Sequence, residues 1–343
     1  MASVKPIIGG GLFLSKDNWT PAALKSCLED LRVRGATEID VAQGYGDSEE
    51  LLGEARAGES FNIATKIPGI MDPDSLRKHQ VIHRTQASLK KLNIKQIDIL
   101  YLHSPDPTIP IEETLSGIQQ LFEDGAFRRF GVSNHTAEEV QRIYDHQKSQ
   151  GWVLPTVYQG NYNPLTRSFE RTLFPTLRKL GISFYAYSPT AGGFLAKTKQ
   201  QVMDGAGRFG KEGGAQGFFY NEMSNKPSML EALTAWNEIA QDAGVSGYDL
   251  ATRWVAFSSA LDPAHEDGIV MGASSVPQLG GNLVGLKKGP LPAAIVSRIS
   301  RVWDKVSHEA PVVDIPFITS TGMKQVHPKQ GSSTLSKSLV FSE

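Results

Sequence analysis

The sequence has very little cysteine and no long apolar run. Its one cysteine, Cys27, cannot form an internal disulfide, so nothing indicates an oxidising compartment. No window approaches the roughly 18 consecutive apolar residues that a membrane-spanning helix needs. The stretch from Met1 to Gly11 also lacks the apolar core of a secretory signal. We therefore expect a cytoplasmic protein that has no membrane partner.

Net charge is also nearly absent. The 35 basic and 36 acidic residues leave a formal charge of −1 at pH 7. There is thus no overall positive field to attract nucleic acid, which we do not expect as a partner, although a local cationic site for a phosphate stays open. Hydrophobic residues make up 40% of the chain and charged residues 21%, a composition that excludes a wholly disordered protein.

The composition stays uniform up to about residue 318. From Thr319 to Glu343 the chain is polar, with few large apolar residues, which predicts a flexible C-terminal tail. We expect residues 1–318 to form a single domain. An α/β barrel of about 250 residues with insertions fits this length as well as two smaller domains do.

Short apolar runs alternate with amphipathic segments through this domain. Runs rich in Ile, Val, Phe and Tyr predict strands at residues 7–9, 37–40, 61–66, 97–103, 127–132, 156–159, 183–187 and 268–272. Helical spacing and capping signals predict helices at residues 21–34, 75–92, 112–123, 138–148, 169–180, 229–243 and 292–306. This α/β alternation predicts a parallel sheet. Because no Gly-rich dinucleotide fingerprint follows the first strand, we favour a closed (β/α)8 TIM barrel over an open sheet.

Residues 195–227 interrupt the alternation. They follow the seventh predicted strand and are rich in glycine. A loop this long usually has a function or is mobile. In a barrel it would lie over one face, which makes closure over a bound ligand a hypothesis.

Polar side chains stand at the carboxyl ends of the predicted strands, where barrel enzymes place their active sites. In chain order they are Asp40, Lys66, His103, Ser133 with Asn134, Gln159, and Tyr187 with Ser188. Tyr45 follows Asp40 in the next loop. A closed barrel brings all these positions together around one mouth.

Four of these residue types suit proton donation to an oxygen. A Tyr hydroxyl has a pKa near 10, too high for an efficient donor at neutral pH. A Lys ammonium about 4 Å away favours the phenolate by up to about 4 kcal/mol at an effective dielectric constant of about 20, which lowers that pKa by roughly two to three. Asp40 can hold Lys66 charged, and His103 can polarise a carbonyl oxygen. No side chain supplies a hydride, so we infer a reduced nicotinamide cofactor.

Each residue alone also has an ordinary structural interpretation. Asp40 suits a turn or helix cap, Tyr45 a partly buried aromatic, and Lys66 a solvent-facing strand end. His103 suits a hydrogen-bonded structural histidine. Their joint occurrence at the strand ends favours function. The histidines show no metal-ligand spacing, so we expect no metal. No Gly-x-Ser-x-Gly supports a hydrolase.

The sequence resembles the aldo-keto reductases over roughly residues 7–310. Asp40, Tyr45, Lys66 and His103 match the catalytic tetrad of that family in order and spacing. The segments at 131–134, 159–164, 186–193 and 272–282 resemble its cofactor-binding segments, and those at 40–45, 191–195 and 207–210 are most similar to the aflatoxin-aldehyde reductase branch.

The resemblance implies reduction of an aldehyde or ketone to the alcohol by direct hydride transfer from NADPH, in a monomer or homodimer. Tyr45 would be the general acid, tuned by Lys66 and Asp40, and His103 would orient the carbonyl. The implied cofactor contacts are Ser133, Asn134 and Gln159 at the carboxamide, Tyr187 against the ring, Ser188, Pro189, Gly192 and Gly193 at the pyrophosphate, and Gly272, Ser274, Gln278 and Asn282 toward the adenosine.

Two departures from the family pattern bear on cofactor and substrate. Many members hold the 2′-phosphate with a Lys or Arg, a Ser and a later Arg where this chain has Gly272, Ala273 and Gln278. The charge can come instead from Lys197, Lys199 or Arg208 in the long loop, so we expect NADPH and leave NADH open. The loop stretch Phe218–Met223 is aromatic and slightly acidic where the related branch has arginines. We therefore expect bulky, aromatic or polyketide-like carbonyls rather than anionic ones.

Two other functions stay open. The potassium-channel β-subunits resemble the same family, so a non-catalytic, cofactor-binding regulatory subunit is one alternative. Fold alone also allows an unrelated barrel enzyme, such as a Schiff-base aldolase using Lys66. Fast turnover of a small aldehyde would argue against the regulatory subunit. Borohydride trapping of a lysine–substrate adduct would support the aldolase.

Overall fold

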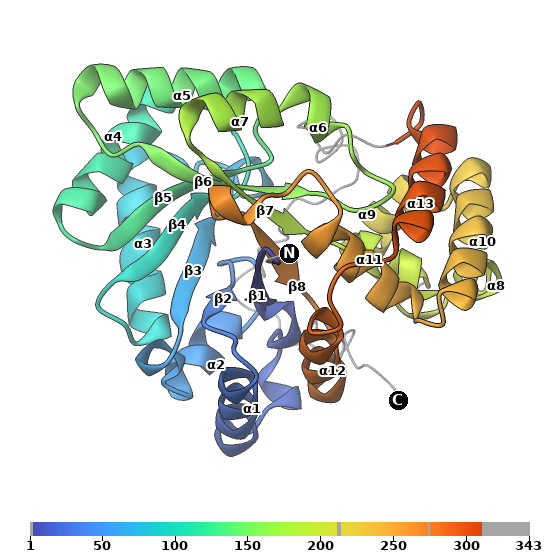
Figure 1. The fold of residues 1–343 in the computed structure, drawn as a ribbon. Helices are drawn as coiled ribbons and strands as arrows, with labels where there is room; N and C mark the ends of the chain where they lie inside the picture. The colour runs from blue at the N-terminus through green and yellow to red at the C-terminus, as the bar shows by residue number, and fades with distance from the viewer. Residues whose placement is uncertain (1–2, 211–213, 274, 311–343) are drawn as a thin grey trace.

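Eight parallel strands form a closed barrel (Figure 1) in the computed structural model, which describes residues 3–210, 214–273 and 275–310. The strands are β1 Lys5–Gly9, β2 Glu38–Asp40, β3 Asn62–Ile67, β4 Ile97–Leu102, β5 Phe127–Ser133, β6 Pro155–Asn161, β7 Ser183–Tyr187 and β8 Gly268–Met271. Each pairs with the next in chain order, and β8 closes on β1. The predicted TIM barrel is confirmed. The tail predicted at residues 319–343 lies outside the described residues.

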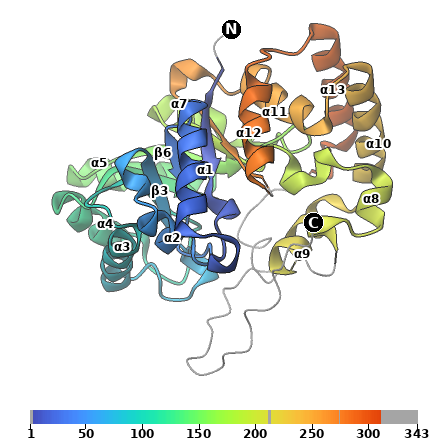
Figure 2. The ribbon, with the colours of Figure 1, turned by 90° about the horizontal axis from the view of Figure 1, so that it is seen from below.

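Helices surround the barrel. They are α1 Pro21–Val33, α2 Ser48–Glu54, α3 Lys78–Leu92, α4 Ile111–Glu123, α5 Ala137–Gln150, α6 Phe169–Thr172, α7 Phe174–Leu180, α8 Lys199–Met203, α9 Gly214–Ser224, α10 Pro227–Asp242, α11 Gly247–Phe257, α12 Val276–Leu286 and α13 Ala293–Val306. As the sequence predicts, Thr20 caps α1 by accepting a hydrogen bond from the Ala23 amide at 3.2 Å. Figure 2 shows α8, α9, α10 and α13 gathered at one side of the barrel.

The structure differs from the prediction in three places. The helix expected at 169–180 is two helices, α6 and α7, because Pro175 in the first turn of α7 cannot continue α6. Helices α2, α11 and α12 were not predicted, and the glycines inside α12 explain its weak signal. The segment at 195–227 is not a bare loop, since it contains α8 and α9.

The barrel interior is built in layers. Its middle is an apolar cluster of Ile7, Ala64, Ile99, Tyr101, Val157, Tyr185 and Val270. Toward the amino ends of the strands, Lys5 donates to Glu38 at 2.7 Å and Arg129 pairs with Asp98. The carboxyl ends carry the polar residues singled out above. The apolar layer therefore separates the two polar ends of the barrel.

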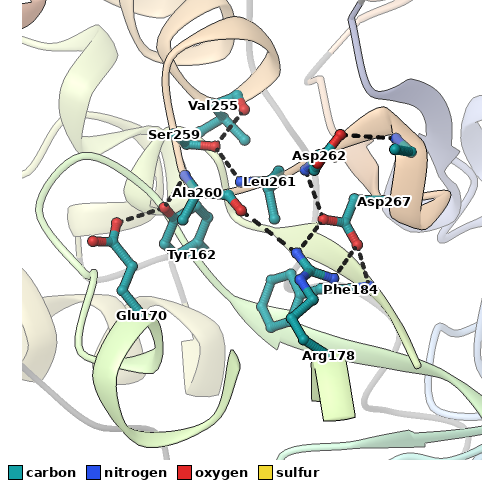
Figure 3. A network of polar contacts seen from close by, with 11 residues as sticks. Tyr162, Glu170, Arg178, Phe184, Val255, Ser259, Ala260, Leu261, Asp262 and Asp267 are labelled. Atoms are coloured by element: carbon teal, nitrogen blue, oxygen red, sulfur yellow. Dashed lines mark hydrogen bonds and ion pairs between the residues drawn. The ribbon is translucent and has the colours of Figure 1, made fainter. Parts of the chain in front are cut away.

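A buried ion pair joins α7, β7 and the chain that precedes β8 (Figure 3). The carboxylate of Asp267 accepts hydrogen bonds from the amides of Phe184 at 2.7 Å and Asp262 at 2.8 Å. Arg178 of α7 donates to both oxygens of the same carboxylate, at 3.0 Å and 2.5 Å. The side chain of Asp267 is fully buried, so Arg178 is the cation that compensates its charge.

Removing this cation should destabilise the barrel. We expect Arg178→Ala to lower the free energy of unfolding by about 3 kcal/mol, because Asp267 would remain buried without its partner. Arg142→Ala removes the cation of an exposed pair with Glu112 and should cost less than about 1 kcal/mol. Urea denaturation of both variants measures the difference, and equal costs would contradict this role of the pair.

Candidate active site

A buried ion pair lies at the carboxyl end of the barrel. The Lys66 ammonium contacts both carboxylate oxygens of Asp40 and donates to the carbonyl oxygen of Val41 at 2.7 Å. Gln159 reaches the same carboxylate from β6, with Nε2 at 3.0 Å from each oxygen. Lys66 is fully buried and Asp40 nearly so. These contacts compensate both charges within the barrel.

Tyr45 is held beside this pair by the loop after β2. Its amide donates to the Ala42 carbonyl oxygen at 2.9 Å. Gly46 follows with φ of +51°, and a Cβ there would lie 2.2 Å from the Leu14 carbonyl oxygen, so only glycine fits. Ser48 then donates to the carbonyl oxygen of Phe13 at 2.8 Å. The loops after β1 and β2 are thereby locked together, which fixes Tyr45.

The four residues of the predicted tetrad lie together. The Lys66 Nζ atom is 5.2 Å from the centroid of the Tyr45 ring. The rings of Tyr45 and His103 meet edge to face, with centroids 6.0 Å apart. Asp40 completes the group through Lys66. A carbonyl oxygen placed between Tyr45 and His103 would meet two hydrogen-bond donors.

Burial dominates the electrostatics of this site. It raises the pKa of Tyr45 well above its usual value; Asp40 and Tyr220 add to the rise and Arg208 opposes it. The expected lowering of this pKa by Lys66 is therefore wrong in direction, because burial of the Tyr45 hydroxyl outweighs the nearby cations. Burial, together with the charge of Lys66, lowers the pKa of His103 to about 3. At neutral pH both Tyr45 and His103 are therefore uncharged.

Ser133, Asn134 and Tyr187 form a hydrogen-bonded chain beside the tetrad. Asn134 donates to the carbonyl oxygen of His103 at 2.9 Å and to the hydroxyl of Ser133 at 3.1 Å. The hydroxyl of Tyr187 donates to Asn134 Oδ1 at 2.9 Å. Asn134 takes a left-handed conformation, with φ of +59°. The ends of β4, β5 and β7 are thus joined at the mouth.

The segment from Ser188 to Gly193 follows β7 and has an unusual backbone. Ser188, Gly192 and Gly193 have φ of +52°, +67° and +96°, and Pro189 lies between them in the sequence. The hydroxyl of Tyr220, from α9, lies 2.6 Å from Ser188 Oγ. A Cβ on Gly192 would fall 2.3 Å from the Tyr220 ring. The missing side chain therefore makes room for this tyrosine.

Helix α9 reaches from this segment to the loop after β3. Met71 of that loop packs in a buried cluster with Phe219 and Met223, with Ile70 and Tyr220 at its edge. β3 and β7 are on opposite sides of an eight-stranded barrel, so α9 passes over its mouth. The sequence pointed to the aromatic stretch of α9 but not to Met71 or to the contact between Tyr220 and Ser188. Both depend on contacts distant in sequence.

Two cations of the long segment lie near each other. A Cβ on Gly207 would be 3.5 Å from Lys197 Nζ, and burial together with the neighbouring Arg208 lowers the pKa of Lys197. The Arg208 guanidinium lies 5.1 Å from the centroid of the Tyr220 ring. Within the described ranges neither cation forms an ion pair. Such a pair of like charges suits an anion.

Two of the residues predicted for the adenosine end, Gly272 and Asn282, contact each other. The carbonyl oxygen of Gly272 accepts from Tyr248 at 3.2 Å and from Asn282 at 3.5 Å. The amide of Gln278 donates to Ser275 Oγ, which caps α12, at 3.4 Å. Ser274 lies outside the described residues.

Comparison with known proteins identifies the family. The model for the "Aldo/keto reductase family" matches residues 7–304. The chain belongs to this family. It is 40% identical to aflatoxin B1 aldehyde reductase member 2 from Homo sapiens, over 84% of this chain and 83% of that protein. It is 39% identical to oxidoreductase sirO from Leptosphaeria maculans (81% and 84%), and 36% identical to aldo-keto reductase MYCFIDRAFT_156381 from Pseudocercospora fijiensis (81% and 97%).

The family gives the reaction class. The chain is a nicotinamide-dependent carbonyl reductase whose substrate is a small-molecule carbonyl compound, as the resemblance in the sequence implied. Among the described residues no group of His, Cys, Asp or Glu is arranged to hold a metal ion. None of the described helices has the length and apolar character of a membrane span.

The depressed pKa of His103 leads to a direct prediction. With a pKa near 3, the imidazole is neutral throughout pH 5–8, so its NMR signals should not move in that range. Histidine-selective two-dimensional spectra measure this, and the spectrum of His103→Gln assigns the signal. A His103 signal that titrates with a midpoint near 6.5 would show that the site does not bury the ring.

Proposed function

We propose that this enzyme reduces bulky aromatic aldehydes or ketones to alcohols with NADPH, and that Tyr45 donates the proton. The observation that supports this most is the meeting of Tyr45, His103 and the Asp40–Lys66 pair at one barrel mouth. A bound reduced nicotinamide would supply the hydride.

Each residue has a separate task in the proton transfer. Tyr45 keeps its proton at neutral pH and releases it to the carbonyl oxygen as negative charge develops there. Lys66, 5.2 Å from the centroid of its ring, stabilises the phenolate that remains. Asp40 keeps Lys66 charged, and Gln159 holds Asp40. Neutral His103 donates a hydrogen bond that orients the carbonyl.

The residues along the mouth fit the proposed cofactor. Ser133, Asn134 and Gln159 carry hydroxyl and amide groups suited to a carboxamide, and Tyr187 offers a ring beside them. The backbone from Ser188 to Gly193 and the positions at Gly272, Gln278 and Asn282 would hold the rest. Lys197 and Arg208 form no ion pair among the described residues, and they favour the cofactor with the additional phosphate, NADPH, over NADH.

The side chains over the mouth support the proposed substrate class. Met71, Phe219 and Met223 are buried together, while Phe218 is 50% exposed. Sulfur and aromatic groups adapt to large flat molecules and give no anchor for a carboxylate. Two human relatives carry names of aflatoxin B1 aldehyde reductases, which supports an aldehyde.

Loss of the Tyr45 hydroxyl tests the proton donor. We expect Tyr45→Phe to reduce kcat by roughly 10²–10⁴, because the general acid is removed while the ring remains. Oxidation of NADPH, followed by absorbance at 340 nm with a panel of aldehydes and ketones, measures it. Tyr144→Phe removes the same hydroxyl from α5, outside the barrel, and should leave kcat unchanged. Tight cofactor binding by the native protein without any turnover would favour a regulatory subunit instead.

The two cations test the cofactor preference. We expect Lys197→Gln and Arg208→Gln each to weaken NADPH binding about tenfold and NADH binding less, because a charge-assisted contact is lost. Quenching of tryptophan fluorescence gives both dissociation constants. Lys199→Gln, at an exposed position of α8, is the matched control. An equal loss for the two cofactors, or a loss only in Lys199→Gln, would contradict the proposed contact.

A further inference from the structure

Lys66, Tyr101 and Gly131 are neighbours across three strands. Lys66 of β3 is the register partner of Tyr101 of β4, and Tyr101 is the partner of Gly131 of β5. Tyr101 belongs to the apolar cluster inside the barrel, directly below the polar mouth. The three residues therefore occupy one level of the barrel interior.

The absence of a side chain at Gly131 leaves space for the ring of Tyr101. A Cβ on Gly131 would lie 2.4 Å and 2.5 Å from two carbons of that ring, Cδ1 and Cε1. Any other residue at 131 would push the ring from its place. Tyr101 is fully buried, and its hydroxyl has no hydrogen-bond partner among the described residues. A buried unpaired hydroxyl is costly, so the position uses the ring and gains nothing from the hydroxyl.

The face of that ring points at the Lys66 ammonium. The Nζ atom lies 5.6 Å from the centroid of the Tyr101 ring and 5.2 Å from that of Tyr45. Both distances are within the range in which an aromatic face attracts a cation. Lys66 is therefore held by one carboxylate, one carbonyl oxygen and two aromatic faces. Of the residues that supply these contacts, Tyr101 alone belongs neither to the predicted tetrad nor to the loop after β2.

We propose that Tyr101 is a positioning residue for the active site, whose ring face holds the Lys66 ammonium in place beneath Tyr45. That this matters for proton donation rests on the proposed function, whereas the effect on Lys66 does not. The titratable groups that act on Lys66 or Tyr101 are Asp40, Glu49, Tyr45 and His103 near the mouth, and Glu38, Arg129 and Tyr185 below.

The physical reason is the balance that sets the charge of Lys66. Burial lowers the pKa of this lysine, and Asp40 raises it by contact and hydrogen bonding. A ring face adds attraction for the charged form only, since the neutral amine does not interact with the ring quadrupole in this way. Leucine in place of Tyr101 would keep an apolar side chain but lose the attraction. Phenylalanine would keep it.

The test is the pKa of Lys66 in the whole protein. It is measured by NMR of protein labelled with ¹³C at lysine Cε, with the Lys66 signal assigned by its absence in Lys66→Met. In Tyr101→Leu and Tyr101→Met the pKa should fall by about one, a tenfold loss of proton affinity, whereas Tyr101→Phe should match the native value. Ile99→Ala, a cavity in the same cluster with no ring facing Lys66, is the control and should also match it.

Two results would overturn the proposal. One is an unchanged Lys66 pKa in both ring-free variants. The other is a fall in Tyr101→Phe as large as in Tyr101→Leu, which would assign the effect to the hydroxyl. The pH profile of kcat adds a second readout. Its basic limb should move to lower pH in Tyr101→Leu and stay in Tyr101→Phe and Ile99→Ala.

Failure of this proposal and failure of the proposed function are distinguishable. A native protein that reduces no carbonyl compound would refute the function, and the NMR titration would still decide the role of Tyr101. Normal turnover together with an unmoved Lys66 titration would refute only the role of Tyr101.

Discussion

The buried ion pair between Asp40 and Lys66 is the constraint on which the rest of the site depends. A lysine without any exposed surface cannot stay charged unless a partner and hydrogen bonds replace water. The partners of Lys66 come from β2 and from the residue that follows it, and Gln159 of β6 donates to Asp40 from across the barrel. Only a closed barrel in the correct register brings these groups together. The pair therefore links the fold to the chemistry.

Local backbone geometry around the pair is equally specific. Asn134 and Ser188, at the ends of β5 and β7, both have positive φ, which non-glycine residues rarely adopt. Each takes part in a hydrogen bond at the mouth, to His103 and to Tyr220 respectively. Strain of this kind persists only where the surroundings compensate it. The apolar layer below and helix α9 above provide that rigidity.

Much of the fold could be predicted from sequence because its signals are local. The strand at 183–187 was placed without error, and the other strands to within a few residues, since buried parallel strands are short runs of apolar residues. Helices α2, α11 and α12 were not predicted. α2 has only seven residues and α12 contains three glycines, which weakens the helical signal of both, whereas α11 follows an N-cap serine, Ser246, that could have revealed it. Residues 319–343 and Ser274 lie outside the described residues.

The candidate site, like the fold, combines positions that local sequence reveals with contacts that only the folded barrel creates. The four residues predicted as the tetrad could be placed at one barrel mouth, because each ends a strand or follows one closely. The contact of Gln159 with Asp40 could not be predicted, since the two residues are far apart in sequence and meet only when the barrel closes. The inward-facing position of Tyr101 could have been predicted from the sequence. It stands two residues before His103, so the alternation of a strand places both on the inner face. That alternation applies to every strand of the barrel.

In the proposed reaction, hydride passes directly from the cofactor to the carbonyl carbon beside Tyr45. The most direct measurement uses NADPH that carries deuterium at the transferable C4 position, with analysis of the alcohol by mass spectrometry and NMR. We expect one deuterium on the carbinol carbon and none on the hydroxyl, whose proton Tyr45 takes from solvent. An alcohol formed without deuterium on that carbon, from either C4-deuterated epimer, would contradict direct transfer.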